Sequence, residues 1–151
     1  MAVVEQRREA DLAVTELYAA HWRGLVRLAW LLLHDQGEAE DVVQDAFVEV
    51  HRGWGRLRDP ARAPAYLRRA VVNRCRSALR HRGVVERYTA AGGTAPPADT
   101  EALGSLTRDA LLAALSRLPQ RQREVLVLRY YGGLSEAEIA EATGITRGTV
   151  K

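Results

Sequence analysis

The spacing of apolar residues is the feature that most limits how this chain can fold. Near the N-terminus, bulky or apolar side chains recur at intervals of 4, 3, 4 and 3 residues, the repeat of one helix face. These residues are Tyr18, Trp22, Leu25, Ala29 and Leu32. The same repeat returns in later segments, whereas the alternation typical of β-strands does not. The sequence therefore predicts an all-α protein whose first helix ends near the stretch HDQG, residues 34–37.

A second helix is predicted after that stretch, and it has two different faces. Its apolar face consists of Ala39, Val42, Val43, Ala46, Phe47 and Val50. Its acidic face consists of Glu38, Asp41, Asp45 and Glu49. A di-metal site built from helical carboxylates would use a Glu-x-x-His motif, which this sequence lacks. The acidic face is therefore interpreted as a docking surface for a basic protein partner, and no metal or other cofactor is expected.

A loop and a third helix follow. Residues 52–64 include two glycines and two prolines, which predicts a loop, and Pro64 suits the first turn of the next helix. The helix runs through residues 65–82 and divides into two faces. The inner face contains Leu67, Ala70, Val71, Cys75 and Ala78, and the outer face contains Arg69, Asn73, Arg76 and Arg80.

Two interpretations of the outer face remain open. A charged stripe on a helix is most often only a solvated surface. In the preceding loop, however, Trp54 stands between two glycines and amid arginines at positions 52, 56 and 58. Such a mixture suits single-stranded nucleic acid, because aromatic rings stack on unpaired bases while guanidinium groups hold the backbone. Trp54 is equally compatible with a plug that covers the end of the helical bundle.

Residues 83–107 are predicted to be a flexible linker between two helical domains, at residues 1–82 and 108–151. The linker contains the stretch AAGGTAPPADTEALGS, which is rich in small residues, glycine and proline and has no helical stripe. The chain is thus expected to contain two small units with separate roles.

The second domain has the pattern of a helix-turn-helix. Ser135 and Glu138 form a capping box, and Gly144 allows a tight turn before the next helix. A recognition helix places its first residues against base edges and phosphates in the major groove. The residues placed for such contacts are Thr146, Arg147, Thr149 and Lys151. A helical hairpin that binds nothing is the plainer alternative. The coincidence of the capping box, the glycine turn and a second cap at Thr146 disfavours it.

Charge is distributed unevenly along the chain. Residues 1–52 hold 5 Arg against 10 Asp and Glu, whereas residues 53–90 hold 10 Arg against 2 acidic residues. An acidic part beside a basic part suggests two different partners, one of them anionic.

The remaining composition disfavours several classes of protein. The single cysteine, Cys75, excludes an internal disulfide and favours a reducing cytosol. It is either a small core residue, which its apolar face favours, or a thiolate stabilised by nearby arginines. No signal peptide is expected, because the first residues, MAVVEQRREAD, have no apolar core after their charges. No membrane insertion is expected either, because the apolar run at residues 28–33 is too short to cross a bilayer. No nucleophile with a positioned base is apparent, so an enzyme is not expected.

In combination, these segments resemble the extracytoplasmic-function (ECF) sigma factors of bacteria. Their order is that of the family: acidic helix, tryptophan-containing loop, arginine- and asparagine-bearing helix, linker, helix-turn-helix. The matching stretches are AEDVVQDAFVEV (39–50), AYLRRAVVNRCRSALR (65–80), LPQRQREVLVLRYYGGLSEAEIA (118–140) and GITRGTVK (144–151). Within the family the chain is similar to the arginine-rich actinobacterial SigE-like type.

The resemblance implies roles for particular residues. Those implied in docking on the beta-prime clamp helices of core RNA polymerase are Asp41, Gln44, Asp45 and Phe47. Those implied in melting and capturing the minus-ten promoter element are Trp54, Arg58, Tyr66, Arg69, Asn73, Arg76 and Arg80. Residues 108–151 would meet the polymerase beta flap and read the minus-thirty-five element with Thr146, Arg147, Thr149 and Lys151. Many relatives carry an acid four residues after the asparagine, where this chain has Ser77.

The expectation is therefore a cytoplasmic sigma factor, nucleoid-associated when bound to polymerase, with promoter DNA, core polymerase and an anti-sigma factor as partners. One alternative is a stand-alone helix-turn-helix regulator that binds duplex DNA without polymerase. Another is a decoy that holds polymerase or an anti-sigma factor without full promoter contact. Relatives continue the last helix for several turns, so the second domain, which is winged-helix-like, is expected to be truncated in its recognition helix.

Overall fold

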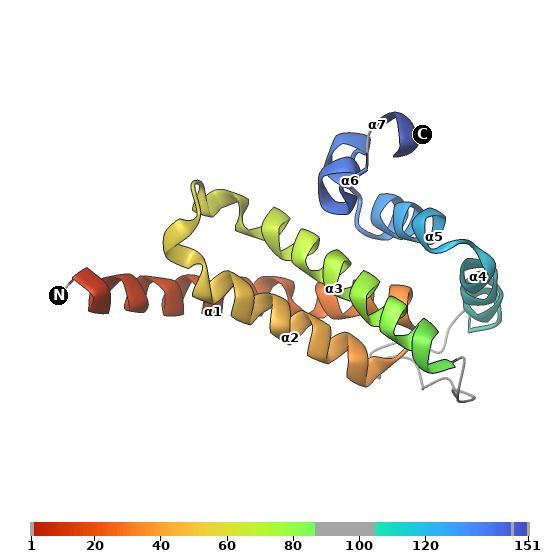
Figure 1. Ribbon diagram of the computed structural model, residues 1–151, viewed down its shortest axis with the longest axis horizontal. Coiled ribbons are helices and arrows are strands. Elements are labelled where there is room, and N and C mark those ends of the chain that lie inside the picture. The colour runs from red at the N-terminus through yellow and green to blue at the C-terminus, as the bar shows by residue number, and fades with distance from the viewer. Residues whose placement is uncertain (1, 87–104, 146, 151) are drawn as a thin grey trace.

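The computed structural model describes residues 2–86, 105–145 and 147–150, and all regular elements in these ranges are helical (Figure 1). They are α1 (Ala2–Leu33), α2 (Gln36–Arg52), the 3-10 turns η1 (Trp54–Arg56) and η2 (Pro60–Arg62), α3 (Ala63–Glu86), α4 (Ser105–Arg117), α5 (Gln120–Leu126), the π-helical η3 (Val127–Tyr131), α6 (Glu136–Thr143) and α7 (Arg147–Val150). The predicted all-α class with two helical domains is confirmed. The first unit contains α1 to α3 and the second α4 to α7.

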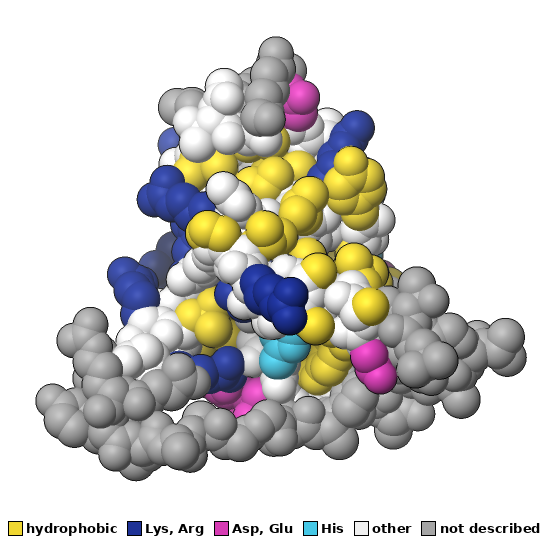
Figure 2. All heavy atoms as spheres, turned by 90° about the vertical axis from the view of Figure 1, so that its right-hand side faces the viewer, with side chains coloured by type: hydrophobic (Ala, Val, Ile, Leu, Met, Phe, Trp, Pro, Cys, Tyr) yellow, Lys and Arg dark blue, Asp and Glu magenta, His cyan; other side chains and the backbone are white. Residues whose placement is uncertain are grey.

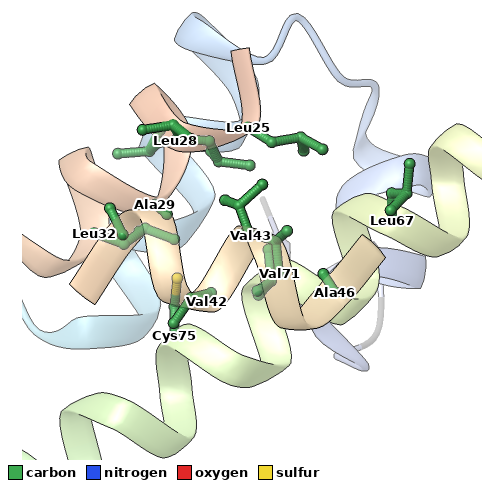
Figure 3. Packing of buried hydrophobic residues seen from close by; sticks show 14 of the residues in the cluster. Leu25, Leu28, Ala29, Leu32, Val42, Val43, Ala46, Leu67, Val71 and Cys75 are labelled. Atoms are coloured by element: carbon green, nitrogen blue, oxygen red, sulfur yellow. The ribbon is translucent and has the colours of Figure 1, made fainter. Parts of the chain in front are cut away.

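The first unit is a bundle of three long helices, beyond which the N-terminal part of α1 projects (Figure 1). Its apolar faces converge on one core, as the close view in Figure 3 shows. The labelled core residues are Leu25, Leu28, Ala29 and Leu32 from α1, Val42, Val43 and Ala46 from α2, and Leu67, Val71 and Cys75 from α3. The 3.6-residue periodicity of the sequence thus identified the face that each of these three helices buries, except that Tyr18, the first residue of the predicted stripe on α1, is 44% exposed.

The boundary between α1 and α2 lies at the predicted stretch. His34 leaves the first helix with a φ of 57°, in the left-handed region that commonly ends helices. The side chain of Asp35 then caps α2 by accepting a hydrogen bond from the backbone N–H of Glu38 at 3.0 Å. This tight connection brings α2 back alongside α1.

The loop at residues 52–64 is more regular than its glycines and prolines suggest, because η1 and η2 form within it. Asp59 caps η2 by accepting from the Ala61 N–H at 3.1 Å, and Pro60 occupies the first turn. The third helix then continues to Glu86, four residues beyond the predicted end of the first domain at residue 82. Most of the predicted linker, residues 87–104, lies outside the described residues.

Close backbone packing shapes the turn that leads into α6. A Cβ at Gly132 would lie 2.8 Å from the Leu128 carbonyl oxygen and 2.8 Å from Leu134 Cδ1, so only glycine fits there. Gly144 ends α6 with a φ of 74°, the left-handed conformation expected for the turn of a helix-turn-helix. Leu134 and Ile139 are buried on either side of the α6 N-terminus.

The predicted capping box at the start of α6 is present. The Ser135 hydroxyl accepts from the Glu138 N–H at 3.2 Å, and the Glu138 carboxylate accepts from the Ser135 N–H at 3.3 Å. These hydrogen bonds, with a smaller contribution from Arg68, lower the pKa of Glu138.

Replacing Ser135 with alanine is expected to lower the free energy of unfolding by about 1 kcal/mol. Urea denaturation would measure this, and Ser135→Asn should retain most of the stability.

The second unit packs on the first rather than standing apart from it. Its buried residues Leu128, Ile139 and Ala142 belong to the same contacting apolar cluster as the core of the first unit. The helix α6 contacts α3, and η3 contacts α1. In Figure 1, α5 and α6 accordingly lie above α3, toward its C-terminal end. In the described ranges, no helix is long and apolar enough to cross a membrane.

Candidate polymerase and nucleic-acid interfaces

The acidic face of α2 is a solvent-exposed surface, as predicted. Asp41, Gln44 and Asp45 are all exposed on it. Arg74 of α3, which the sequence analysis had not singled out, lies beside this surface, with Nη2 3.2 Å from Glu49 Oε2 and Nη1 3.8 Å from Asp45 Oδ2. Within the described part of the chain Asp41 forms no ion pair. Its carboxylate therefore remains available to a partner.

Phe47 differs from the other residues implied in docking because it is a core residue. Only 4% of its surface is exposed. Its ring centroid lies 5.2 Å from that of Tyr18 and 6.2 Å from that of Trp22, and those two rings stack at 4.7 Å. The prediction of direct contact by Phe47 is therefore corrected. The helical period that places Asp41 and Asp45 outward turns Phe47 inward, where it holds α2 against α1.

A cleft of about 320 Å³ lies between the end of α2, the following loop and α3. Three of the residues implied in minus-ten recognition line it: Tyr66, Arg69 and Asn73. Its other walls are formed by Glu49, Val50, Gly53, Leu57 and Ala70. The fold thus brings an aromatic ring, a guanidinium and an amide to one hollow, whose other walls are apolar except at Glu49. The sequence placed Val50 on the apolar face of α2 but gave no signal that Leu57 would join it at the cleft, because that depends on how the loop folds back.

The remaining basic and aromatic residues of this region surround the cleft without lining it. Trp54, in η1, is partly buried and packs against the core, which supports its role as a plug and leaves part of its surface accessible. Arg58 and Arg80 are exposed. Nη2 of Arg80 donates to the Ser77 hydroxyl at 3.3 Å, so the serine that replaces the family's acid still provides a hydrogen-bond acceptor.

Arg76 does not lie on the open outer face to which it was assigned. Its guanidinium binds the carboxylate of Glu124, a residue of α5 with only 1% exposure. The assignment of Arg76 to an exposed face is therefore wrong. The reason lies in tertiary packing, because a buried carboxylate requires a cation and Arg76 is the residue of α3 that faces Glu124. No sequence pattern pointed to Glu124, because an acidic residue near arginines in the first turns of a helix is usually solvated.

The residues implied in minus-thirty-five recognition are only partly described. The backbone of α7 is helical from Arg147 to Val150, and Thr149 is exposed on it. Thr146, Lys151 and the side chain of Arg147 lie outside the described residues. The turn that orients α7 is present at Gly144, so a helix begins where a recognition helix was predicted.

Other kinds of site receive no support from the described residues. Burial raises the pKa of the Cys75 thiol, with further contributions from Glu124 and Glu38, so the residue is an inert part of the core. In the ranges given above, no group of three or more His, Cys, Asp or Glu residues is arranged to hold a metal ion.

Comparison with known proteins identifies both units. Residues 17–84 match the family model for sigma-70 region 2, and residues 108–151 match that for sigma-70 region 4. The chain is 36% identical over 144 residues to the ECF RNA polymerase sigma factor SigM of Mycobacterium tuberculosis, covering 92% of this chain and 70% of that protein. It is 34% identical over 127 residues to the RNA polymerase sigma-E factor of Streptomyces coelicolor, covering 84% and 71%.

Solved structures agree with this assignment. The sigma factor RpoE from Bartonella quintana, in complex with the anti-sigma factor NepR, has a TM-score of 0.75 at 23% identity, over 90% of this chain and 86% of that one. CnrH, in complex with the cytosolic domain of CnrY, has a TM-score of 0.65 at 25% identity, over 96% and 86%. The first likeness shows a shared fold.

Two sigma-70 regions on one helical chain define a transcription initiation factor that works with RNA polymerase. The chain belongs to the extracytoplasmic-function (ECF) sigma factors, as its relatives' identities and coverage show. Its function is accordingly that of an RNA polymerase sigma factor, which acts in promoter recognition and transcription initiation.

Proposed function

We propose that this sigma factor gives core RNA polymerase its promoter specificity through two separate DNA contacts. Residues 1–82 dock on polymerase through the acidic face of α2 and capture the melted minus-ten element beside α3. Residues 108–151 read the minus-thirty-five element as a duplex. The observation that supports this most is the cleft lined by Tyr66, Arg69 and Asn73, next to the tryptophan-bearing loop. It combines the groups that bind an unpaired base with those that hold its backbone.

The chemistry of the cleft suits a base that has left the helical stack. Tyr66 offers a ring for stacking, and the Asn73 amide can both donate to and accept from a base edge. Arg69 is exposed at the cleft and can bind a phosphate or a purine edge. The apolar walls favour a base over water. Capture of an unpaired base stabilises the melted form over the duplex, so promoter opening requires differential binding and no bond-breaking step. The chain is therefore proposed to act without enzymatic activity.

The partners follow from the two exposed surfaces. The acidic face of α2 is proposed to meet the beta-prime clamp helices, and the second unit the beta flap. Figure 2 shows hydrophobic side chains gathered between arginines on the side of the molecule that the second unit forms. In the second unit Leu126 and Tyr130 are exposed, at 37% and 81%, and such residues suit a protein contact. One solved structure of similar fold is a complex of a sigma factor with an anti-sigma factor, which supports an anti-sigma factor as a partner of this chain. The chain itself is proposed to act with polymerase in the cytoplasm and on the nucleoid.

Run-off transcription tests the proposed function directly. Core polymerase is incubated with a promoter library, with and without this chain, and defined transcripts are expected only when the chain is present. Binding to core polymerase without any transcript would instead identify a decoy. Strong site-specific binding to duplex DNA in the absence of polymerase would favour a stand-alone regulator.

Docking on polymerase is expected to depend on Asp41. Because this exposed carboxylate has no ion pair within the described residues, Asp41→Arg should leave the fold intact and oppose a basic partner. Binding to core polymerase should weaken by about tenfold or more, since like charges across an interface cost several kcal/mol. A pull-down with purified core enzyme measures this. The matched control is Glu16→Arg, which makes the same change at an exposed position of a different helix, α1. An equal loss for both variants would contradict the assignment.

A further inference from the structure

One wall of the cleft beside α3 is acidic, which opposes binding of the DNA backbone. Glu49, near the end of α2, lines this cleft together with Tyr66, Arg69 and Asn73. A carboxylate repels phosphate groups, so it adds no affinity for the backbone of a nucleic acid. Among groups that suit an unpaired base, a carboxylate can act favourably only on the base itself.

The side chain of Glu49 extends from α2 to α3, where Arg74 binds it. Nε and Nη2 of Arg74 donate to Glu49 Oε2, at 3.3 and 3.2 Å. Arg74 directly follows Asn73 in α3, so the carboxylate is bound next to the asparagine of the cleft. The two side chains of this ion pair are 39% and 57% exposed, and such a pair adds little stability. Its main consequence is to orient the carboxylate, because the planar guanidinium donates twice to one oxygen.

The other carboxylate oxygen, Oε1, remains available for a hydrogen bond. Within the described residues both hydrogen bonds to the Glu49 carboxylate end on Oε2, and none ends on Oε1. Glu49 is exposed, so a ligand in the cleft can reach it. An ionised carboxylate only accepts hydrogen bonds, so Oε1 favours a donor and disfavours a second acceptor.

The four bases present different groups to such an acceptor. Cytosine and adenine carry an exocyclic amino group, N4 or N6, which donates. Thymine and guanine carry a carbonyl oxygen at the corresponding position, O4 or O6, and this oxygen would face the carboxylate. The Asn73 amide can donate to the ring nitrogen beside the amino group of cytosine or adenine. Glu49 and Asn73 together therefore match an amino group that lies beside an acceptor.

We propose that Glu49 is a specificity-determining residue of the cleft and that Arg74 is its positioning residue. The amino group of an unpaired cytosine or adenine donates to Oε1 of Glu49 while Arg74 binds Oε2, and thymine and guanine are disfavoured. This inference rests on the proposed function, because it concerns the same captured base of the minus-ten element. It adds a direct contact for Glu49 and an orienting role for Arg74.

Transcription from a randomised template library tests the preference, with the full chain bound to core polymerase. Every template has random bases in the minus-ten element and a transcribed barcode that identifies it. For the parent chain, one position should favour cytosine or adenine about tenfold over thymine and guanine, the effect of one hydrogen bond to a charged group. Glu49→Gln should reduce this ratio to about twofold or less, because its amide also offers a donor. The matched control is Glu16→Gln, the same change at an exposed position of α1, which should keep the ratio.

Deaminated bases separate the amino group from the rest of the base. On one efficient promoter the favoured base is replaced by its deaminated counterpart, uracil for cytosine or hypoxanthine for adenine, in each strand in turn. With the parent chain, transcription should fall about tenfold for one of the strands, whereas Glu49→Gln should transcribe both templates within about twofold of each other. Equal transcription of the two templates by the parent chain would overturn the proposal, because a feature other than the amino group would then be recognised.

The positioning role of Arg74 is measured by the same base ratio. Arg74→Ala should reduce the ratio by about threefold, because Glu49 is present but no longer oriented, and Arg74→Lys should restore most of it. Adding Arg74→Ala to Glu49→Gln should lower the ratio no further, since Arg74 acts through Glu49. A further loss in this double variant would overturn the positioning role.

The outcomes distinguish this inference from the proposed function. Defined transcripts with the same base ratio in the parent chain and in Glu49→Gln would overturn the inference and leave the proposed function intact. An equal loss of the ratio in Glu16→Gln would assign the effect to net charge and would overturn the role of Glu49. No transcript from any template, with any variant, would overturn both the proposed function and the inference.

Discussion

Replacing Arg69 and Asn73 together with alanine is expected to reduce run-off transcription by about a hundredfold without changing thermal stability. Both side chains are exposed, both line the cleft beside α3, and within the described residues neither has an intramolecular hydrogen bond or ion pair. Removing them therefore costs the folded protein little. Each lost contact to a base edge is worth about 1–3 kcal/mol, and about 1.4 kcal/mol corresponds to tenfold, so two contacts give roughly two orders of magnitude.

A control for this result uses the same residue types elsewhere. Gln6→Ala with Arg7→Ala also removes one amide and one guanidinium from exposed positions, on the part of α1 that projects beyond the bundle. This control should retain transcription within about twofold, in line with neutral surface substitutions. Pull-down of core polymerase should be unaffected in both double variants, which would place the defect at the promoter. Full transcription by the Arg69 and Asn73 variant would remove the cleft from the proposed mechanism.

Periodicity and capping were sufficient to predict most of the fold. Ala29, Leu67 and Val71 are buried where a helical repeat places them, and Ser135 caps α6 as the pattern indicates. These features are local, because a repeat or a cap depends on residues within a few positions of each other. The family resemblance added roles for particular residues, which local patterns alone do not determine.

The sequence could not predict which arginines remain free. Arg69 and Arg76 are equivalent in spacing and residue type, yet one is exposed and the other binds a buried glutamate 48 positions away. The difference depends on where α5 packs, and no local signal encodes that position. Likewise, no sequence pattern distinguishes Glu124 from a solvated acid, whereas the packed arrangement encloses it.

The remaining large effect concerns the core, where Leu67→Ala is expected to lower the free energy of unfolding by about 2–5 kcal/mol. Leu67 has no exposed surface and belongs to the apolar cluster to which α1, α2 and α3 contribute. Its truncation removes apolar burial and leaves a cavity that rigid neighbouring helices fill only in part. Urea denaturation followed by circular dichroism measures the change. Leu12→Ala, at a leucine that is 70% exposed, should change stability by less than about 0.5 kcal/mol.

The number of steps in the urea unfolding transition shows whether the two units share one cooperative core. Because Leu128 and Ile139 of the second unit belong to the same apolar cluster as Leu67, the chain should unfold in one cooperative step, and Leu67→Ala should shift that entire step. Glu124→Gln removes the carboxylate charge that Arg76 binds between the units. It should separate the transition into two, of which only that of the first unit responds to Leu67→Ala. Two transitions in the parent chain would show that the units fold independently and that their contact adds no cooperativity.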